Sequence, residues 1–398
     1  MIKRLIVPWT TLFVLAILVG CGGEGGTDAT TRIAWDSAGV RIVDLTPVPP
    51  VSTRNLSLDP TWLVEFDREL GRLGDVVPLE EEGAVILDEM AGSIFVLDGA
   101  GRVVLEFGGL GEGPGEFSPQ GGISQVLATD SSLMVPDIQL QRITEFAMDG
   151  EVLSITAMPR AGPEEGPMFG VDWRLHPEGG IVFRALHPEG DRIHWFRDGE
   201  LQRLHVFDVP WPSMNQLLPP TAIWDLSREG DLVLGRSDRA RVERRGLDEH
   251  APRWITRWAD AGGDLTIRDR THLEELLLLA AEEQGLGSLP AEERQRILSS
   301  VTLPDSVPVV ASLLADERGR TWVQGVTPIP EMGLEAMRVG SSAGFGGTEW
   351  RVLGPDGDLD DVVNLPRGFT PRGFVGDCMF GIFENDLGVQ RPARVCVD

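Results

Sequence analysis

The chain has 398 residues, with 62 aspartates and glutamates against 35 lysines and arginines, and its formal net charge is −27 at pH 7. This balance argues against a nucleic-acid partner, because phosphate binding needs a basic surface and a polyanion would be repelled. The hydrophobic fraction of 42% can fill a core, while 48 glycines and 28 prolines predict a mainly β chain with frequent turns.

An export signal occupies residues 1–20. Lys3 and Arg4 precede an almost wholly apolar run over residues 5–19. The run is shorter than the roughly 18 to 20 residues that cross a bilayer, and glycine-rich residues follow it at once. We therefore expect residues 1–20 to be removed as a signal peptide, which leaves 33 basic against 62 acidic residues and a formal charge of −29.

The signal ends in Leu-Val-Gly-Cys at residues 18–21, which resembles the lipobox of bacterial lipoproteins. The resemblance implies that Cys21 carries the lipid anchor on its thiol and on its new amino group, and two or more acyl chains hold a protein durably. Gly22 and Gly23 follow the cysteine, which by analogy with enteric lipoproteins favours the outer membrane of the cell envelope. Residues 21–31 then form a flexible tether. The alternative is a soluble secreted protein in which Cys21 has no role.

Residues 32–398 repeat one theme: an apolar strand, a short turn, a second apolar strand and a more polar one. The copy at residues 84–107 is typical, and others begin near residues 124, 173, 223, 312 and 373. Each copy is an antiparallel meander of roughly 40 residues with Asp-Gly or Glu-Gly turns, as in a propeller blade. Blades bury their faces only against one another, so the ring must close.

The last copy lacks one strand, and we expect the segment around residues 56–66 to supply it. The sequence therefore predicts an all-β fold, a six-bladed β-propeller closed by an N-terminal strand. One insertion, over about residues 266–300, interrupts the pattern between the fourth and fifth blades. Leucines there recur at helical spacing among glutamates, and residues 290–298 predict a second short helix. The helical hairpin either caps one face of the ring, carries a partner surface, or only packs on the blades.

Two cysteines remain once Cys21 is assigned to lipid. Cys378 and Cys396 lie in alternating segments joined by the turn-rich residues 384–388, and two antiparallel strands would bring the thiols together in an oxidising compartment. We therefore predict a disulfide. Buried reduced thiols are the alternative, and a metal site is disfavoured because neither cysteine has a neighbouring ligand at Cys-x-x-Cys spacing.

Residues 108–117, Gly-Gly-Leu-Gly-Glu-Gly-Pro-Gly-Glu-Phe, resemble the connection between blades in bacterial six-bladed propellers related to NHL repeats. Residues 36–43 look like the leading segment of lipoproteins in that group. Residues 133–137, followed by Arg142 and Phe146, are similar to the NHL-type strand pattern. The resemblance spans nearly all of the mature chain, more weakly in the third and fourth copies, and implies the fold without any catalytic set.

Few residues point to chemistry. The glycines of residues 111–115 lack the Lys-Ser/Thr of a nucleotide loop and stand beside glutamates, which favours a tight connection between blades. None of the six histidines forms a paired ligand motif, although His176 and His194 share one presumed blade and could form a metal or acid–base pair. Trp211, framed by two prolines in a loop, is a candidate ligand or partner contact.

Turn aspartates offer the other candidate site. Asp98, Asp137 and Asp316 could converge at the central tunnel and hold calcium, as in propeller lactonases and sugar-acid hydrolases. The favoured interpretation is that they cap hairpins by accepting hydrogen bonds from nearby backbone amides.

The sequence thus supports a non-enzymatic binding or scaffold protein first, without a cofactor, anchored to a membrane and recognising a protein, peptide or glycan. A calcium-dependent hydrolase or lyase with its site at the tunnel mouth is the alternative. A third hypothesis is a sensor that works through a membrane partner.

Overall fold

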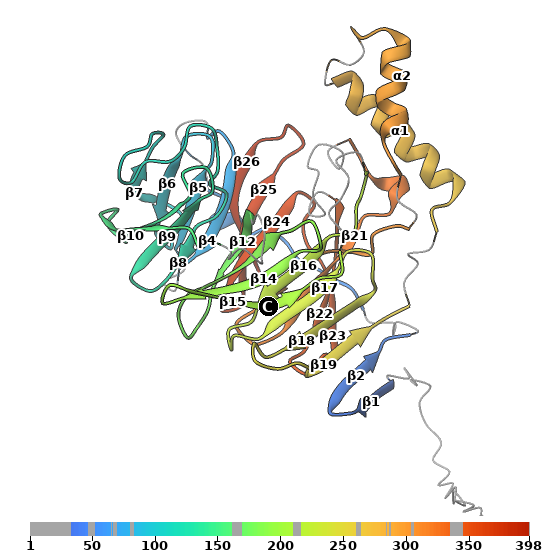
Figure 1. The fold of residues 1–398 in the computed structure, drawn as a ribbon, viewed down its shortest axis with the longest axis horizontal. Helices are drawn as coiled ribbons and strands as arrows, with labels where there is room; N and C mark the ends of the chain where they lie inside the picture. The colour runs from blue at the N-terminus through green and yellow to red at the C-terminus, as the bar shows by residue number, and fades with distance from the viewer. Residues whose placement is uncertain are drawn as a thin grey trace, which may run out of the picture. The chain divides into compact units, whose positions relative to one another are not determined.

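The structure, a computed structural model, describes residues 33–46, 52–64, 66, 70–79, 83–160, 169–209, 216–259, 264–283, 285, 288–303, 306–334 and 345–397. Six β-sheets follow one another in chain order from residue 73 onward and are arranged around a common axis (Figure 1). Each is a blade whose first strand lies innermost, and together they form the six-bladed β-propeller that the repeats predict.

The first three blades are regular four-stranded antiparallel meanders. Blade 1 consists of β4 (Leu73–Pro78), β5 (Ala84–Asp88), β6 (Ser93–Leu97) and β7 (Val103–Gly108). Blade 2 consists of β8 (Leu127–Ala128), β9 (Ser132–Asp137), β10 (Arg142–Ala147) and β11 (Val152–Ala157). Blade 3 consists of β12 (Phe169–Leu175), β13 (Ile181–Leu186), β14 (Arg192–Arg197) and β15 (Glu200–Val206).

Each of the last three blades is extended at its outer edge by a segment of the N-terminal chain. Blade 4 consists of β16 (Ala222–Leu226), β17 (Leu232–Arg236), β18 (Arg241–Arg245) and β19 (Trp254–Arg257). Blade 5 consists of β20 (Val310–Ala315), β21 (Thr321–Val326), β22 (Gly346–Leu353) and β23 (Leu359–Asn364). Blade 6 has only three strands of its own, β24 (Phe369–Val375), β25 (Cys378–Glu384) and β26 (Gln390–Cys396).

Apolar clusters between successive blades close the ring. Each cluster joins side chains of one blade to side chains of the next, and the cluster between blades 6 and 1 completes the circle. In that cluster Phe380 and Ile382 of blade 6 pack with Val76 and Phe95 of blade 1. Burial on both faces explains why several inner strands, such as β5 and β17, are nearly continuous apolar runs.

The N-terminal strap, residues 33–46 and 52–64, runs along the outer edges of blades 4, 5 and 6 in turn. Its β1 (Ile33–Ser37) and β2 (Val40–Asp44) form a hairpin, and β2 pairs in parallel with β19 of blade 4. The short β3 (Arg54–Asn55) then pairs in parallel with β23 of blade 5. The sequence did not predict either of these additions to blades 4 and 5.

At blade 6 the strap takes the place of the missing fourth strand, as predicted, but in a different form. The amide of Asp59 donates to the carbonyl of Arg394 (2.8 Å), and that of Val64 donates to the carbonyl of Pro392 (3.1 Å). Between these bonds lies a single 3₁₀ turn, η1 (Pro60–Trp62), because Pro60 has no amide hydrogen for a ladder and the Asp59 carboxylate caps the turn. The closing segment is therefore an interrupted edge rather than a regular strand.

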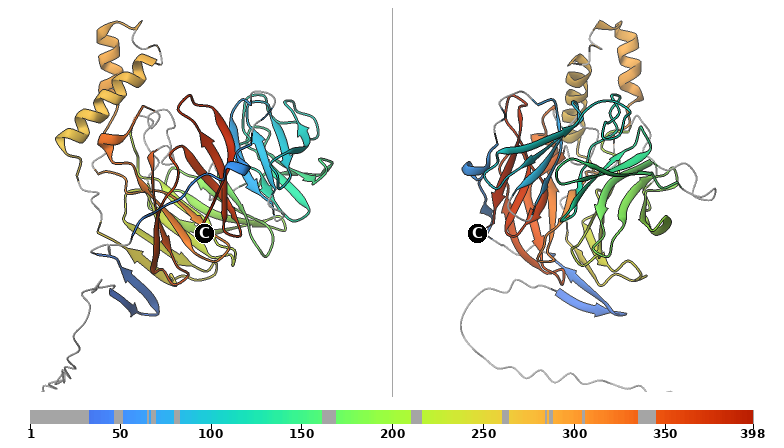
Figure 2. Two further views of the ribbon diagram at one scale, coloured as in Figure 1. Left: turned by 180° about the vertical axis from the view of Figure 1, so that it is seen from behind. Right: turned by 90° about the vertical axis from the view of Figure 1, so that its left-hand side faces the viewer.

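The helical insertion lies where the sequence places it. Helices α1 (Ile267–Glu283) and α2 (Ala291–Ser300) form a hairpin that stands off the sheets (Figure 2). Leu273 and Leu276 of α1 are buried against Leu218 and against the turn η3 (Ile329–Glu331), so the hairpin packs on loops of the ring. Neither helix among the described residues is long and apolar enough to span a bilayer.

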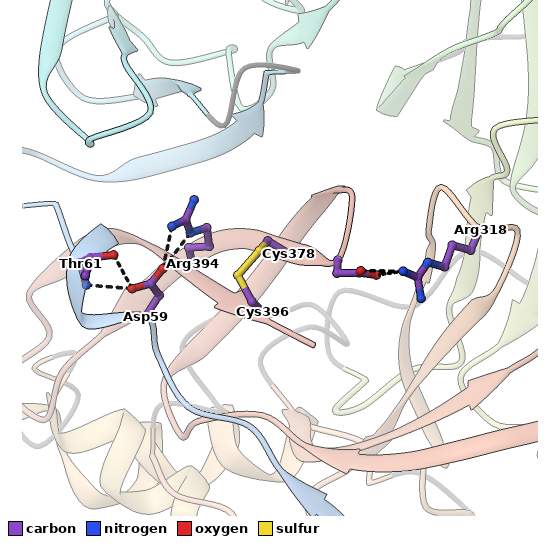
Figure 3. The surroundings of a disulfide bond; sticks show 7 residues. Asp59, Thr61, Arg318, Cys378, Arg394 and Cys396 are labelled. Atoms are coloured by element: carbon purple, nitrogen blue, oxygen red, sulfur yellow. Dashed lines mark hydrogen bonds and ion pairs between the residues drawn. A yellow bond between two sulfur atoms is a disulfide. The ribbon is translucent and has the colours of Figure 1, made fainter. Parts of the chain in front are cut away.

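The predicted disulfide lies within blade 6. Cys378 of β25 and Cys396 of β26 are direct partners in the antiparallel register, and their sulfurs are bonded. Figure 3 shows the disulfide beside the ion pair of Asp59 and Arg394. The covalent link therefore holds together the two strands on which the strap closes the ring.

Candidate ligand site on the propeller axis

Charged residues stand on the innermost strands of four blades, where the remainder of each strand is largely apolar. We call this group, with its direct partners, the axial cluster. Its members are Asp75 of β4, Asp172 and Arg174 of β12, Asp225 of β16 and Arg372 of β24, together with Arg184 of β13 and Asp191. The cluster brings together chain segments that are up to about three hundred residues apart in the sequence.

β-Bulges place two of these residues. The register of β12 against β13 skips Asp172, and the register of β24 against β25 skips Arg372. Asp172 also has φ +51°, a left-handed conformation that costs a non-glycine residue free energy. Blades 3 and 6 are opposite each other in a ring of six, so the two bulges face across the axis. Bulges are common where a side chain has been re-aimed toward a functional site.

One ion pair ties three blades together at the axis. The Arg174 Nε of blade 3 donates to Asp225 Oδ1 of blade 4 (2.5 Å), and Asp225 Oδ2 accepts from the amide of Ala315 in blade 5 (2.7 Å). The Arg174 guanidinium also lies 5.6 Å from the ring centre of Trp224. Both carboxylate oxygens of Asp225 thus accept a hydrogen bond from the protein.

A second chain of charges lies within blade 3. The Arg184 Nε donates to Asp172 Oδ2 (2.8 Å), and its Nη1 donates to Asp191 Oδ2 (2.7 Å). Burial alone would raise the pKa of Asp172, but the positive charges of Arg184, Arg174 and Arg372 outweigh it and lower that pKa. Burial dominates at Asp191 and raises its pKa despite Arg184. Asp172 is therefore held as the carboxylate.

Asp75 is among the buried members of the cluster, with 7% of its surface exposed. Its carboxyl group accepts from the amides of Val76 (3.0 Å) and Val126 (3.1 Å), the latter in the segment that leads into blade 2. Burial raises the pKa of Asp75, and the charges of Arg372 and Arg174 only partly offset this. Asp75 acts as a fastening between blades 1 and 2.

Solvent reaches the centre of the cluster. The side chain of Asp172 is 45% accessible and that of Arg174 is 29% accessible. Arg372 is exposed, and no hydrogen bond or ion pair joins its guanidinium to any residue that the structure describes. Its charge nevertheless affects both Asp75 and Asp172. The axial cluster is therefore a partly open site with one cation that has no direct partner in the described chain.

The donors of the site fit a hard cation poorly. Calcium prefers several oxygen atoms that are free to approach one point. Here Asp225 and Asp172 bind arginines, and Asp75 accepts two backbone amides. Across the ranges that the structure describes, there is no group of three or more histidine, cysteine, aspartate or glutamate side chains placed to hold a metal ion.

The three turn aspartates are hairpin caps, as the favoured interpretation predicts. Asp98 accepts from the amides of Ala100 and Arg102 (both 3.0 Å). Asp137 and Asp316 likewise accept amides of their own turns, and Asp137 also accepts the amide of Ser118 (2.9 Å). The capping interpretation is confirmed, because these carboxylate oxygens accept amide hydrogen bonds locally, and the calcium alternative stays a prediction.

The glycine-rich loop connects blades 1 and 2, as expected. The Glu116 carboxylate accepts from the amide of Gly113 (2.8 Å), and the Arg142 guanidinium donates to the carbonyls of Glu112, Gly113 and Glu116. Gly115 has φ +76° and lies against Phe146, where a larger residue would be strained. These contacts give a structural reason for an arginine and a phenylalanine to accompany such a loop.

Of the remaining candidate residues, the structure describes the two histidines but not Cys21 or Trp211. His176 accepts the amide of Glu178 and lies against Trp195, whereas His194 stacks near Phe183, so the two imidazoles have different neighbours. Cys21 and Trp211 lie outside the described residues.

The sequence alone does not single out the axial cluster. The available signal was a charged residue within an otherwise apolar first strand, as in Ala-Ile-Trp-Asp-Leu at residues 222–226. Such a charge is costly to bury without a partner and therefore marks a site.

No protein-family model matches the chain, and no curated protein matches it. Among solved structures, a member of the DUF4221 family from Bacteroides vulgatus has a TM-score of 0.53 at 12% identity, covering 86% of this chain and 97% of that one. An exported protein from Bacteroides fragilis has a TM-score of 0.48 at 12% identity (87% and 95% covered). Regucalcin, a calcium-binding protein from Agrobacterium tumefaciens, has 0.45 at 11% (87% and 98% covered). The similarity to the first of these supports the six-bladed β-propeller fold, and at 12% identity it extends no further.

Proposed function

We propose that this protein is a lipoprotein of the cell envelope, anchored at the outer membrane through Cys21, whose propeller is a non-enzymatic binding module for a protein, peptide or glycan. The ligand binds at the axial cluster. The observation that carries the proposal is the convergence of charged side chains from four blades on a place that solvent reaches. Residues 1–20 and the cysteine that follows them support export and anchoring.

The chemistry of the cluster supports binding over hydrolysis. A general base needs a carboxylate or imidazole that is free to take a proton. Asp225 and Asp172 instead pair with arginines, and Asp75 is closed off by two amides. Fixed, paired charges suit recognition of a polar ligand, because they are already oriented before the ligand arrives.

The proposal includes a relationship to the NHL-type lipoprotein propellers. The contacts of the loop at residues 108–117 with Arg142 support it, since they tie the motif to one defined connection between blades. The relationship predicts the same loop geometry in other chains that carry the motif.

Affinity capture from solubilised membranes tests the binding role. The test variant is R174Q/D225N, which removes both charges of the axial ion pair and leaves polar side chains in their place. The matched control is R241Q/E243Q, which neutralises a pair of similar length (2.6 Å) on the outer part of blade 4. We expect the native protein and the control to retain the same ligand and the axial variant to lose it. Equal retention by both variants would overturn the axial site.

The anchor has its own test. Cys21→Ser should release the protein from the membrane fraction, and mass spectrometry of the native N-terminus should show acyl chains on Cys21. A Cys21→Ser protein that stays in the membrane fraction would contradict the lipid anchor. Thermal denaturation of the protein with calcium and with a chelator tests the enzymatic alternative. A rise in Tm with calcium would support that alternative.

A further inference from the structure

The axial cluster leaves one charged group without a counterpart. Arg174 binds Asp225, Arg184 binds Asp172 and Asp191, and Asp75 accepts two backbone amides. Arg372 alone has no ion pair or hydrogen bond within the described residues, and its side chain is exposed. Its guanidinium offers five N–H donors in a planar fork.

The position of Arg372 distinguishes it from an ordinary surface arginine. It is the bulged residue of β24, the innermost strand of blade 6. β24 lies beside β4 of blade 1, so closely that a Cβ at Gly373 would come within 3.1 Å of Pro78. Its charge lowers the pKa of Asp172 on the opposite blade and opposes the rise in the pKa of Asp75. The guanidinium is therefore within electrostatic reach of both sides of the axis.

A ligand that completes this arrangement must carry one negative, planar group. A carboxylate matches a guanidinium fork with two parallel hydrogen bonds, and such charge-assisted pairs are stronger than neutral ones. A polyanion is disfavoured, because the chain as a whole has a formal charge of −27.

Asp172 adds a second requirement. Its Oδ2 binds Arg184, while no hydrogen bond to Oδ1 is formed within the described residues. Because Asp172 is held as the carboxylate, Oδ1 can accept a hydrogen bond from a ligand hydroxyl or ammonium group. A suitable ligand thus carries a donor as well as a carboxylate.

The geometry points to a carboxylate-binding subsite at Arg372, in which the ligand carboxylate pairs with the Arg372 guanidinium and a ligand donor meets Asp172 Oδ1. This inference rests on the proposed binding function and defines its ligand chemistry. An acidic sugar and the free end of a peptide both carry that chemistry, with a hydroxyl in the first and an ammonium group in the second.

Titration calorimetry on the detergent-solubilised full protein tests the subsite. D-galacturonate and glycylglycine are the two carboxylate probes, and they distinguish the two sources. The methyl ester of galacturonate and glycylglycinamide are the uncharged-end controls, and inorganic phosphate tests for general anion binding. We expect one carboxylate probe to bind saturably below roughly 10 mM, and its ester or amide partner not to bind.

Three variants locate the binding. Arg372→Gln removes the charge, and we expect a loss of affinity of roughly ten- to hundredfold, as for a charge-assisted hydrogen bond. Arg372→Lys keeps the charge without the guanidinium fork, and its affinity for the carboxylate probe should lie between those of the native protein and Arg372→Gln. Arg367→Gln is the matched control, since Arg367 is also exposed and lies only five residues away, before β24. Its affinity should not change.

Several results would overturn the subsite. They are the absence of saturation by both carboxylates, equal binding by Arg372→Gln, or binding of phosphate that is as tight as that of the carboxylates. Loss of binding in Arg367→Gln as well would show a general charge effect instead. Retained capture by the native protein, together with failure of both carboxylates, would reject the carboxylate subsite and leave the binding function in place.

Discussion

The two halves of the ring differ in whether a further chain segment covers the outermost strand of each blade. On blades 4, 5 and 6 the N-terminal strap covers the outermost strands β19, β23 and β26. On blades 1, 2 and 3 the outermost strands β7, β11 and β15 have no further strand beside them among the described residues. The N-terminal strap thus fastens one half of the ring.

The chemistry of the two kinds of edge also differs. Each part of the strap forms an ion pair with the blade that it reaches or with the next one. The bare edges of blades 1 and 2 instead expose apolar side chains, Val103 and Val104 on β7 and Leu153 and Ile155 on β11. Charge fixes the register of the added segments, since a slip would separate several pairs at once. Changes to the strap should therefore cost more than similar changes to a bare edge.

Trp62→Ala should have the largest effect. Trp62 belongs to the strap, is 1% exposed and meets Phe380 edge to face at 4.9 Å in the cluster that closes the ring. Truncation should lower the free energy of unfolding by about 3–5 kcal/mol, because it removes a large buried side chain and leaves a cavity. Urea denaturation measures this. The control is Leu153→Ala on the bare edge of blade 2, where 53% exposure predicts a change within about 0.5 kcal/mol. Equal effects of the two truncations would contradict the comparison.

Removal of the disulfide should have the second-largest effect on stability. Cys378 and Cys396 are 18 residues apart, and a covalent loop of that length stabilises a fold by about 3 kcal/mol in the chain-entropy description. The double variant C378S/C396S should lose about that amount in urea denaturation under oxidising conditions. A reducing agent should shift the native protein toward the variant and leave the variant unchanged. A native protein that is insensitive to reduction would contradict this.

Acid should first destabilise the half of the ring that the strap does not cover, blades 1, 2 and 3. His205 of β15 lies in blade 3, and burial together with the charge of Arg245, whose Nη2 is 2.9 Å from His205 Nδ1, lowers its pKa to about 4. The unfolded chain takes up a proton near pH 6.5, whereas the folded chain does not until about pH 4. Stability should therefore fall as the pH drops from 6.5 to 4, by at most about 3 kcal/mol from this residue.

His205→Gln removes that contribution, since glutamine does not titrate. The difference in the free energy of unfolding between native protein and variant should change between pH 6.5 and pH 4 and stay constant above pH 7. Denaturation at several pH values measures it. A difference that does not depend on pH would mean that His205 is not held neutral.

The sequence could predict the ring but only part of its fastening. Alternating apolar strands and turn residues predict the blades, and helical spacing predicts α1 and α2. The pairing of β2 with β19 was not predictable, because six outer edges offer similar backbone groups and only the folded ring decides which edge lies nearby. The axial cluster was missed because the bulges at Asp172 and Arg372 break the alternation that shows which side chains face inward.

Asp59→Asn should have the smallest effect and should separate the two halves by pH. The carboxylate of Asp59 caps η1 and pairs with Arg394 Nη2 (2.7 Å). Burial alone would raise the pKa of Asp59, but its hydrogen bonds with Thr61 and Arg394 outweigh this and lower that pKa. The group therefore stabilises the fold above its unfolded pKa of 3.8, and this contribution is lost as the pH falls through the lower folded value.

The Asp59→Asn variant should lose about 1 kcal/mol of unfolding free energy at pH 7 and approach the native protein well below pH 3.8, in denaturation series at matched ionic strength. Asp149→Asn is the control and should change less, because within the described residues the Asp149 carboxylate accepts only the amide of Glu151, in a turn of blade 2. If the two asparagine variants respond alike, the ion pair of the strap contributes nothing beyond a turn cap, and the fastening of blade 6 rests on Trp62 and the backbone bonds alone.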